Sequence, residues 1–358
     1  MSTMRNNSVT ILTNACGAMF MHGFFRCLKE NGERDVRLVG VDMSKTPVED
    51  PLIDAYYSVP AITDPSYVDE LLQICRKEGV DVFFPQISME LNLIRKRVEE
   101  FHALGVKVAI SKDDTLEIAN SKYKLYEYMR EHELTVPQYY LVESIDDLHE
   151  GAAKLGYPER PVCVKVTESS GSRGVRVLRG DLSKSSLFLY AKPTSIYTTM
   201  EDMDDTLREL ETFPEMIVME YLPGCEYTVD LLADHGKVIQ IAGRRNTSSQ
   251  TSIAMESVVE RKEDAYSLCE AIVSTLGLDG NIGFDFMLDE KDNPVLTDLN
   301  PRITATIVLY FAAGVNFPYL RVKQLLGEEL PLCQVKYGTR LVRKYWDILC
   351  DANGNLIC

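Results

Sequence analysis

The chain has 358 residues, 45% hydrophobic and 26% charged, which is an ordinary composition for a globular protein of roughly two or three domains. Asp and Glu number 54 against 38 Lys and Arg, and the net charge of -16 argues against nucleic acids and anionic membrane surfaces as partners. Nine cysteines at irregular spacing, without a CxxC pair, argue against both a disulfide framework and a zinc ribbon.

The N-terminal stretch MSTMRNNSVT is polar, and the sequence contains no apolar run of about 18 residues or more. We therefore expect neither a signal peptide nor a membrane-spanning helix. The expected location is the cytoplasm, where the cysteines would be reduced thiols.

The first 112 residues alternate between strand-like and helix-like segments. Strands are predicted at 9–12, 36–41, 81–85 and 106–110, and helices at 18–29 and 65–78. This alternation predicts a Rossmann-like parallel sheet covered by helices. The turn TNACG after the first strand lacks the GxGxxG fingerprint, so a scaffold is expected here rather than a dinucleotide site.

Residues 113–216 are expected to form linker helices and a small α+β subdomain. Helices are predicted at 121–132 and from Pro137 to about Leu155, and a loop at 183–186. The strands VCVKV and VRVL flank a glycine-bearing turn and predict a hairpin, with Lys165 inside its first strand. The small residues of that turn could let backbone amides approach phosphate oxygens, although tight turns also use Gly for geometry alone.

Residues 217–358 contain several apolar strands, which predict a mostly antiparallel sheet. The stretches MIVMEY, TVDLL and VIQIAG are separated by turn signals, and residues 246–252 are expected to form a loop. Glu220 and Glu226 flank a Pro-Gly turn and could serve a nucleotide or be solvated. Arg244 and Arg245 could clamp a substrate carboxylate or lie on the surface.

The stretch GFDFMLDEKDNPVLTDLNPR predicts a hairpin, because apolar and acidic residues alternate in its first half. If residues 290–293 form its loop, Leu288 lies opposite Val295, and Asp285 lies opposite Asp298.

Two carboxylates in such positions lie about 5 Å apart and repel each other unless a cation lies between them. Asp285, Asp298 and the amide oxygen of Asn300, two residues along, are hard oxygen ligands that suit Mg²⁺. The alternative is a solvated hairpin with scattered acidic residues.

The order of these motifs resembles the ATP-grasp superfamily, and within it the branch of the carbamoyl-phosphate synthetase large subunit and biotin carboxylase. The motifs are NSK, VCVKVTESSGSRGV, MEYLPGCE, and FDF followed by TDLNPR. The resemblance implies an N-terminal Rossmann-like domain at 1–112, linker helices and a lid subdomain at 113–216, and a C-terminal subdomain with the metal site at 217–358. A single ATP-grasp module would be present, with ATP and Mg²⁺, or Mn²⁺ in its place, as cofactors.

The resemblance also implies roles for particular residues. The metal ligands would be Asp285, Asp298 and Asn300, and Arg302 would lie beside the transferred phosphoryl group. With Lys165 and Arg244, Arg302 completes the expected catalytic set. The expected ATP-binding residues are Lys122, Lys165, Ser170, Gly171, Ser172, Gly174, Glu220, Tyr221, Leu222 and Glu226.

The expected activity is an ADP-forming ligase that activates a small-molecule carboxylate as an acyl phosphate and joins it to an amine or similar nucleophile. Phosphoryl transfer needs positioning and charge neutralisation rather than a nucleophilic side chain, and no GxSxG elbow occurs. A small-molecule phosphotransferase and a non-catalytic nucleotide-binding protein are the alternatives. The expected partners are the two small substrates, and the question of a homodimer stays open.

Overall fold

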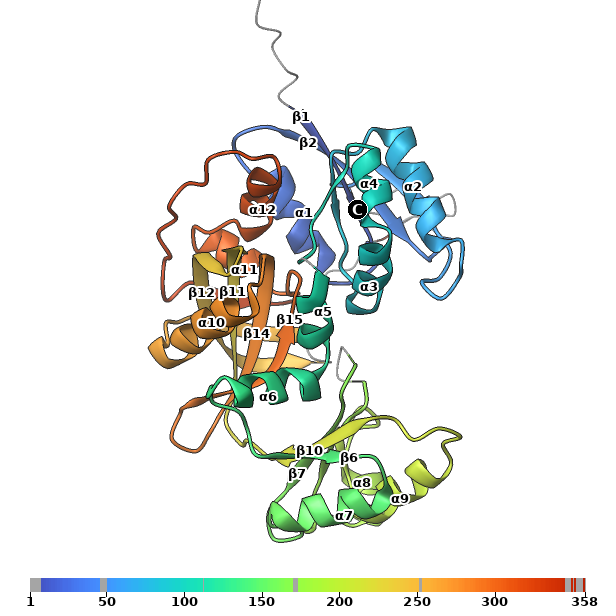
Figure 1. The fold of residues 1–358 in the computed structure, drawn as a ribbon, viewed down its shortest axis with the longest axis vertical. Coiled ribbons are helices and arrows are strands. Elements are labelled where there is room, and N and C mark those ends of the chain that lie inside the picture. The colour runs from blue at the N-terminus through green and yellow to red at the C-terminus, as the bar shows by residue number, and fades with distance from the viewer. Residues whose placement is uncertain are drawn as a thin grey trace, which may run out of the picture.

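The computed structural model describes residues 8–45, 50–111, 113–169, 173–250 and 253–344, together with residues 349, 351 and 357. These residues form an N-terminal domain, a C-terminal domain that packs against it, and a smaller subdomain that extends away from both (Figure 1). The predicted mixture of α/β and α+β parts is confirmed.

The N-terminal domain is a five-stranded parallel sheet with the order β3-β2-β1-β4-β5, which confirms the predicted Rossmann-like sheet. Its strands are β1 (Ser8–Thr13), β2 (Asp35–Asp42), β3 (Ala55–Ser58), β4 (Val82–Phe84) and β5 (Lys107–Val108). Its helices are α1 (Met21–Lys29), α2 (Tyr67–Glu78), α3 (Ser88–Lys96) and α4 (Val98–Ala103). Strand β3 was not predicted, because every residue of this edge strand is half-buried or exposed and no apolar run marks it.

The protruding subdomain, which we call the lid, has a five-stranded sheet with the order β6-β10-β7-β8-β9. It follows the linker helices α5 (Asp113–Asn120) and α6 (Lys122–Glu131). Strands β7 and β8 pair antiparallel, as predicted for the hairpin. The lid contains β6 (Tyr139–Val142), α7 (Ile145–Lys154), β7 (Val162–Val166), β8 (Val175–Leu178), α8 (Lys184–Tyr190), β9 (Tyr197–Thr198), α9 (Met200–Arg208) and β10 (Met216–Glu220).

Two predictions in the lid were wrong at the level of single elements. Residues 139–142 form strand β6 rather than part of a helix, because they pair with β10, and the helix begins only after Ser144, whose hydroxyl caps it. The expected loop at 183–186 is the start of α8. Its serines cap the helix, since Ser183 accepts a hydrogen bond from the backbone N–H of Ser186.

The C-terminal domain is a six-stranded antiparallel sheet with the order β15-β14-β11-β12-β13-β16. Its elements are β11 (Glu226–Asp234), β12 (Lys237–Gln250), β13 (Ile253–Val259), α10 (Glu263–Leu276), β14 (Gly280–Leu288), β15 (Pro294–Asn300), α11 (Val308–Ala312), α12 (Phe317–Leu325) and β16 (Arg340–Val342). The expected loop at 246–252 was wrong over its described part, because β12 continues to Gln250. Residues 251 and 252 lie outside the described residues.

Apolar contacts join the N- and C-terminal domains. Phe24 and Phe25 of α1 share one buried cluster with Tyr310 of α11 and Leu320 of α12. A second cluster packs α6 against the C-terminal sheet through Leu125, among others. The two domains and α6 therefore form a continuous support for residues at their shared boundary.

Two further expectations concern thiols and membranes. The cysteines within the described parts of the chain are all free. Among those same residues, no helix is long and apolar enough to cross a membrane.

Candidate active site

A cavity of about 440 Å³ lies between the lid sheet and the C-terminal sheet. Eleven of the predicted site residues line it: Lys122, Lys165, Glu220, Tyr221, Leu222, Glu226, Arg244, Asp285, Asp298, Asn300 and Arg302. Gly174 lies in the turn of the β7–β8 hairpin, directly before β8, and is not among the residues that line the cavity. Ser170, Gly171 and Ser172 lie outside the described residues.

The predicted hairpin forms from β14 and β15, and Asp285 lies opposite Asp298 as predicted. The predicted pairing of Leu288 with Val295 was wrong, because Leu288 pairs with Pro294. A β-bulge between Asp285 and Phe286 absorbs the one-residue difference, so the two aspartates still meet.

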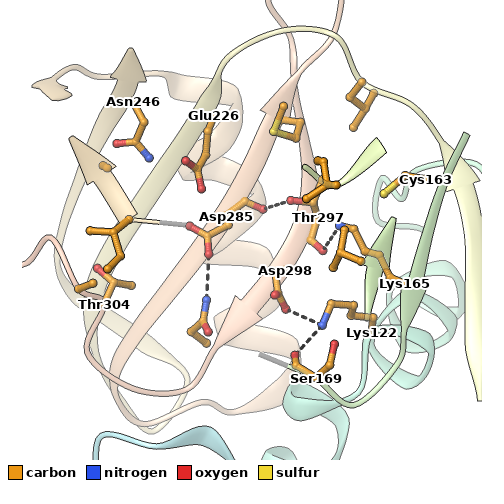
Figure 2. A pocket seen from close by; sticks show the side chains of 18 of the residues that line it. Lys122, Cys163, Lys165, Ser169, Glu226, Asn246, Asp285, Thr297, Asp298 and Thr304 are labelled. Carbon is orange, nitrogen blue, oxygen red and sulfur yellow. Dashed lines mark hydrogen bonds and ion pairs between the residues drawn. The ribbon is translucent and has the colours of Figure 1, made fainter. Parts of the chain in front are cut away.

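The bulge also brings a backbone carbonyl into the site. Thr297, the extra residue, anchors itself by donating its hydroxyl to the Asp285 carbonyl at 3.0 Å. Its own carbonyl accepts a hydrogen bond from Lys165 Nζ at 3.3 Å and another from Tyr126. Figure 2 shows Lys165, Thr297 and Asp298 converging on one side of the cavity. The irregular hairpin thus positions a lysine of the lid beside the paired aspartates.

Asp285 has an environment that disfavours its charge. Burial and the nearby carboxylates of Glu226 and Asp298 raise the pKa of Asp285 to about 7, although Arg244 and a hydrogen bond from Thr228 act in the opposite direction. Its other oxygen accepts a hydrogen bond from Asn300 Nδ2 at 2.9 Å. A cation bound between the carboxylates of Asp285 and Asp298 would relieve their repulsion, which favours the protonated form of Asp285.

Lys122 is anchored where α6 meets the lid. Its side chain is 5% exposed, and Nζ lies 3.5 Å from Asp298 Oδ1 while donating to the Ser169 carbonyl at 3.0 Å (Figure 2). Ser121 caps the helix, and the backbone N–H of Lys122 binds the carbonyl of Thr167 at the end of β7. The helix start and the strand end are therefore tied together, which holds the charge of Lys122 at the cavity.

Arg302 joins the β14–β15 hairpin to the N-terminal domain. Its Nε donates to the hydroxyl of Ser88 at the start of α3, and Nη2 donates to Asn300 Oδ1 at 3.4 Å. Burial lowers the pKa of Arg302, while the nearby carboxylates of Asp285 and Asp298 oppose that shift. A half-buried guanidinium beside the two aspartates is suited to binding an anion such as a phosphate that carries a bound cation.

The strand end at Glu220 and the following turn form the opposite part of the cavity. The Glu220 carboxylate accepts a hydrogen bond from the backbone N–H of Gln138 at 2.8 Å. Tyr221 and Leu222 line the cavity next to it. Glu226 begins β11 and accepts a hydrogen bond from Ser249. Together these residues present backbone and carboxylate groups of the kind that bind a nucleoside.

The two adjacent arginines of β12 point to opposite faces of the sheet. Arg245 makes bidentate contacts to Glu260 and Asp292 away from the cavity. Arg244 is 4% exposed, lines the cavity and pairs with buried Asp230 at 2.5 Å. Of the two candidates for a carboxylate clamp, Arg244 alone faces the site.

Sequence reasoning missed Asn246, Thr228 and Thr304, which lie on the cavity side. Asn246 is buried and hydrogen-bonded to Thr228 and Ser257, and it was missed because its segment was expected to be a loop. Its position two residues after Arg244 is the period-two signal of a shared strand face. Thr304 approaches the sheet closely because residue 283 is Gly: a Cβ there would lie 2.2 Å from Thr304 Cγ2.

Comparison with known proteins identifies the architecture. Residues 212–344 match the family model "ATP-grasp in the biosynthetic pathway with Ter operon", and residues 16–109 match the model "PylC-like, N-terminal domain". The chain contains an ATP-grasp domain. The predicted resemblance is therefore confirmed, with a PylC-like domain preceding the ATP-grasp part.

A protein similar to most of this chain agrees with that match. The arginine-specific large chain of carbamoyl phosphate synthase from Halalkalibacterium halodurans is 21% identical over 80% of this chain. Because the match covers 26% of that relative, the chain spans about a quarter of its length.

Solved structures share the fold. The N5-carboxyaminoimidazole ribonucleotide synthetase solved with ADP has a TM-score of 0.64 and 18% identity, over 94% of this chain and 80% of that one. The biotin carboxylase domain of the Hydrogenobacter thermophilus 2-oxoglutarate carboxylase, solved with MgADP and bicarbonate, has a TM-score of 0.66 and 15% identity, over 92% and 72%. The predicted ATP-grasp fold is thus confirmed over nearly the whole chain.

Proposed function

We propose that the chain is an ATP-dependent ligase that activates the carboxylate of a small molecule as an acyl phosphate, releases ADP and joins the acyl group to an amine. The observation that carries this proposal is the facing pair of Asp285 and Asp298, with Lys122 and Lys165 beside it in one cavity. Opposed carboxylates and lysines around one space suit a metal-bound polyphosphate. Free thiols within the described residues support the cytoplasm as the compartment.

The donor set fits Mg²⁺. Asp285, Asp298 and Asn300 offer side-chain oxygens as ligands. Burial and the carboxylates of Glu226 and Asp298 raise the pKa of Asp285, and a bound cation would favour its charged form. Mg²⁺, or Mn²⁺ in its place, would neutralise phosphate charge and hold the terminal phosphate for attack.

The chain's own groups would position the nucleotide. Lys165, which donates a hydrogen bond to the Thr297 carbonyl, and Lys122 would bind phosphate oxygens. Tyr221 and Leu222 would enclose the base, and Glu226 would accept hydrogen bonds from the ribose hydroxyls. Arg302 would stabilise the charge on the transferred phosphoryl group. No side chain has to form a covalent bond.

The proposed reaction has two steps. A carboxylate oxygen attacks the γ-phosphorus of ATP, the bond from that phosphorus to the bridging oxygen breaks, and ADP leaves. The amine then attacks the acyl carbon and loses a proton as inorganic phosphate leaves. ATP and the two substrates account for every atom and electron.

Trapping with hydroxylamine tests the proposal. The full chain is incubated with ATP, Mg²⁺, hydroxylamine and a panel of small acids, and hydroxamate and ADP are measured together. The expected result is hydroxamate in step with ADP. Formation of AMP would contradict the mechanism, and a stable phosphorylated acid without hydroxamate would favour a kinase.

A further inference from the structure

One row of residues crosses four neighbouring strands of the C-terminal sheet. Thr228 of β11 pairs with Arg244 on one side and with Asp285 on the other, and Asp285 pairs with Asp298. Directly opposite residues share a face, so these four side chains point toward the cavity. Neighbouring strands lie about 4.8 Å apart, which places the Arg244 backbone about 10 Å from that of Asp285. A small ligand at the tip of Arg244 would therefore lie next to a phosphate held by the aspartates.

Arg244 is held by hydrogen bonds from one of its nitrogens, and its other two nitrogens have no hydrogen-bond partner among the described residues. Nη1 makes both of its hydrogen bonds, to Asp230 and at 3.0 Å to the hydroxyl of Tyr310. Nε is buried and has no partner, and Nη2 donates to none of the described residues. A buried donor without a partner costs free energy, which a ligand acceptor would recover. The free edge has the geometry that binds a carboxylate through two parallel hydrogen bonds.

A second guanidinium adds positive charge at this end. Arg343 donates from Nε to the carbonyl of Ala254 at 2.9 Å and from Nη2 to the carbonyl of Ala305 at 3.0 Å. Burial, and then the charge of Arg244, lower the pKa of Arg343. Asp230 neutralises Arg244, but Arg343 is held by carbonyls, so an anion is favoured here.

Three uncharged residues line this end of the cavity. Ala254 and Ala305 line the cavity, and their shared contact with Arg343 places them together. Phe20, the residue directly before α1, also lines the cavity. Helix α1 packs against α11, which carries Tyr310. The cavity's acidic residues are Glu220, Glu226, Asp285 and Asp298, all assigned to nucleotide or metal. Among the residues that the structure describes around the cavity, no further carboxylate is left to pair with an ammonium group of the substrate.

We infer that the Nε and Nη2 edge of Arg244 binds the carboxylate that is phosphorylated, and that the acid is a small monocarboxylate with an uncharged remainder lying toward Phe20 and Ala305. This inference rests on the proposed function and names the substrate class of the same site.

Asp230 and Tyr310 are positioning residues for Arg244. Asp230 is itself held by Thr304, whose hydroxyl donates to it at 2.8 Å. Tyr310 lies with its ring 5.4 Å from the Arg244 guanidinium carbon. Both residues hold Nη1, which leaves Nε and Nη2 without a partner among the described residues.

Calorimetric titration tests the inference. The intact chain, loaded with a non-hydrolysable ATP analogue and Mg²⁺, is titrated with acetate, butanoate, isovalerate and benzoate, and with bicarbonate and glycine for comparison. We expect at least one monocarboxylate to bind better than bicarbonate and glycine. Arg244→Lys, which keeps a charge beside Asp230 but loses the second donor edge, should weaken that acid about tenfold or more.

Arg245→Lys is the matched control, because this neighbour on β12 faces away from the cavity, and it should leave the affinity unchanged. Circular dichroism establishes whether Arg244→Lys is folded. A second measurement needs no variant: butanedione modification of wild-type Arg244, followed by mass spectrometry, should be slowed by the acid.

Absence of binding by every monocarboxylate, preference for bicarbonate or glycine, or equal affinity in Arg244→Lys with no protection of wild-type Arg244, would overturn the inference. Each of these can occur while the ATP analogue still binds and hydroxamate still forms. Failure of the ATP analogue to bind would instead overturn the proposed function.

Discussion

Two polar clusters, one in each sheet domain, differ in whether their hydrogen bonds are complete. In the N-terminal domain, buried Glu90 accepts hydrogen bonds from the Asn14 amide, the Tyr67 hydroxyl and the backbone N–H of Ile87. In the C-terminal domain, Asp285 faces another carboxylate and Arg244 keeps an unpartnered buried Nε. The first cluster is complete without a ligand, whereas the second is suited to receiving one.

The largest expected effect comes from removing one of the opposed carboxylates. Asp298→Asn should lower ATP turnover by about a hundredfold or more, because a metal ligand and a negative charge are lost together. Thermal stability should be equal or higher, since Asp285 loses a repelling neighbour. Glu290→Gln, an exposed carboxylate in the loop of the same hairpin, is the control and should behave as wild type. If Asp298→Asn turned over ATP at nearly the wild-type rate, Asp298 would not be a ligand of the proposed metal site.

Removing a lysine from the phosphate side should have the next largest effect. Lys165→Ala should weaken the binding of a non-hydrolysable ATP analogue by about 1–3 kcal/mol, which is the usual cost of losing a charged hydrogen bond. Calorimetry gives the affinity. Lys184→Ala is the control, since this lid lysine is paired with Asp202 at 2.9 Å outside the cavity. Equal affinities for the two variants would place Lys165 outside the phosphate site.

A substitution in the N-terminal cluster should lower the free energy of unfolding and leave binding of the ATP analogue unchanged. Tyr67→Phe removes the hydroxyl that links Asn14 and Glu90 and should lower the free energy of unfolding by about 1–3 kcal/mol. Tyr140→Phe, at a 38% exposed residue of the lid, should change it by less than about 0.5 kcal/mol. Denaturant titration measures both. Weaker binding of the ATP analogue by folded Tyr67→Phe would show that the two clusters are not separate in function.

The most gradual effect, at most about tenfold per pH unit, is a pH dependence of metal binding. Because the pKa of Asp285 in the folded chain is raised from 3.8 to about 7, folding favours its protonated form, and without metal its contribution to stability falls as pH rises between these values. Mg²⁺ competes with that proton. Its apparent affinity in the presence of the ATP analogue should rise up to about tenfold per pH unit below about pH 7 and level off above it. A flat profile between about pH 5 and pH 8 would contradict the assigned environment of Asp285.

The sequence predicted those parts of the site that depend on local patterns. Alternation along β14 was enough to place Asp285 on the cavity face, and the motif order was enough to indicate the ATP-grasp fold. The pairing of Asp285 with Asp298 was correct because two differences cancelled. The loop is one residue longer than predicted, and the bulge at Thr297 restores the register. A bulge depends on tertiary contacts, here to Lys165 and Tyr126, which a single strand does not reveal.

The roles of Arg244 and Arg245 could not be separated from the sequence. Adjacent residues of a strand point to opposite faces, but which face meets the cavity is set by pairing with β11. The partners that saturate Arg245 come from positions 260 and 292, distant in the chain. Likewise, strand β6 depends on β10, more than seventy residues later.

Transfer of an oxygen isotope tests the central claim most directly. The acid that gives the most hydroxamate is labelled with oxygen-18 in its carboxylate and incubated with ATP, Mg²⁺, hydroxylamine and the intact chain, and the inorganic phosphate is analysed by mass spectrometry. An acyl phosphate leaves one carboxylate oxygen on phosphorus, so the account predicts labelled inorganic phosphate in step with ADP. Unlabelled phosphate, or label appearing in AMP, would contradict it.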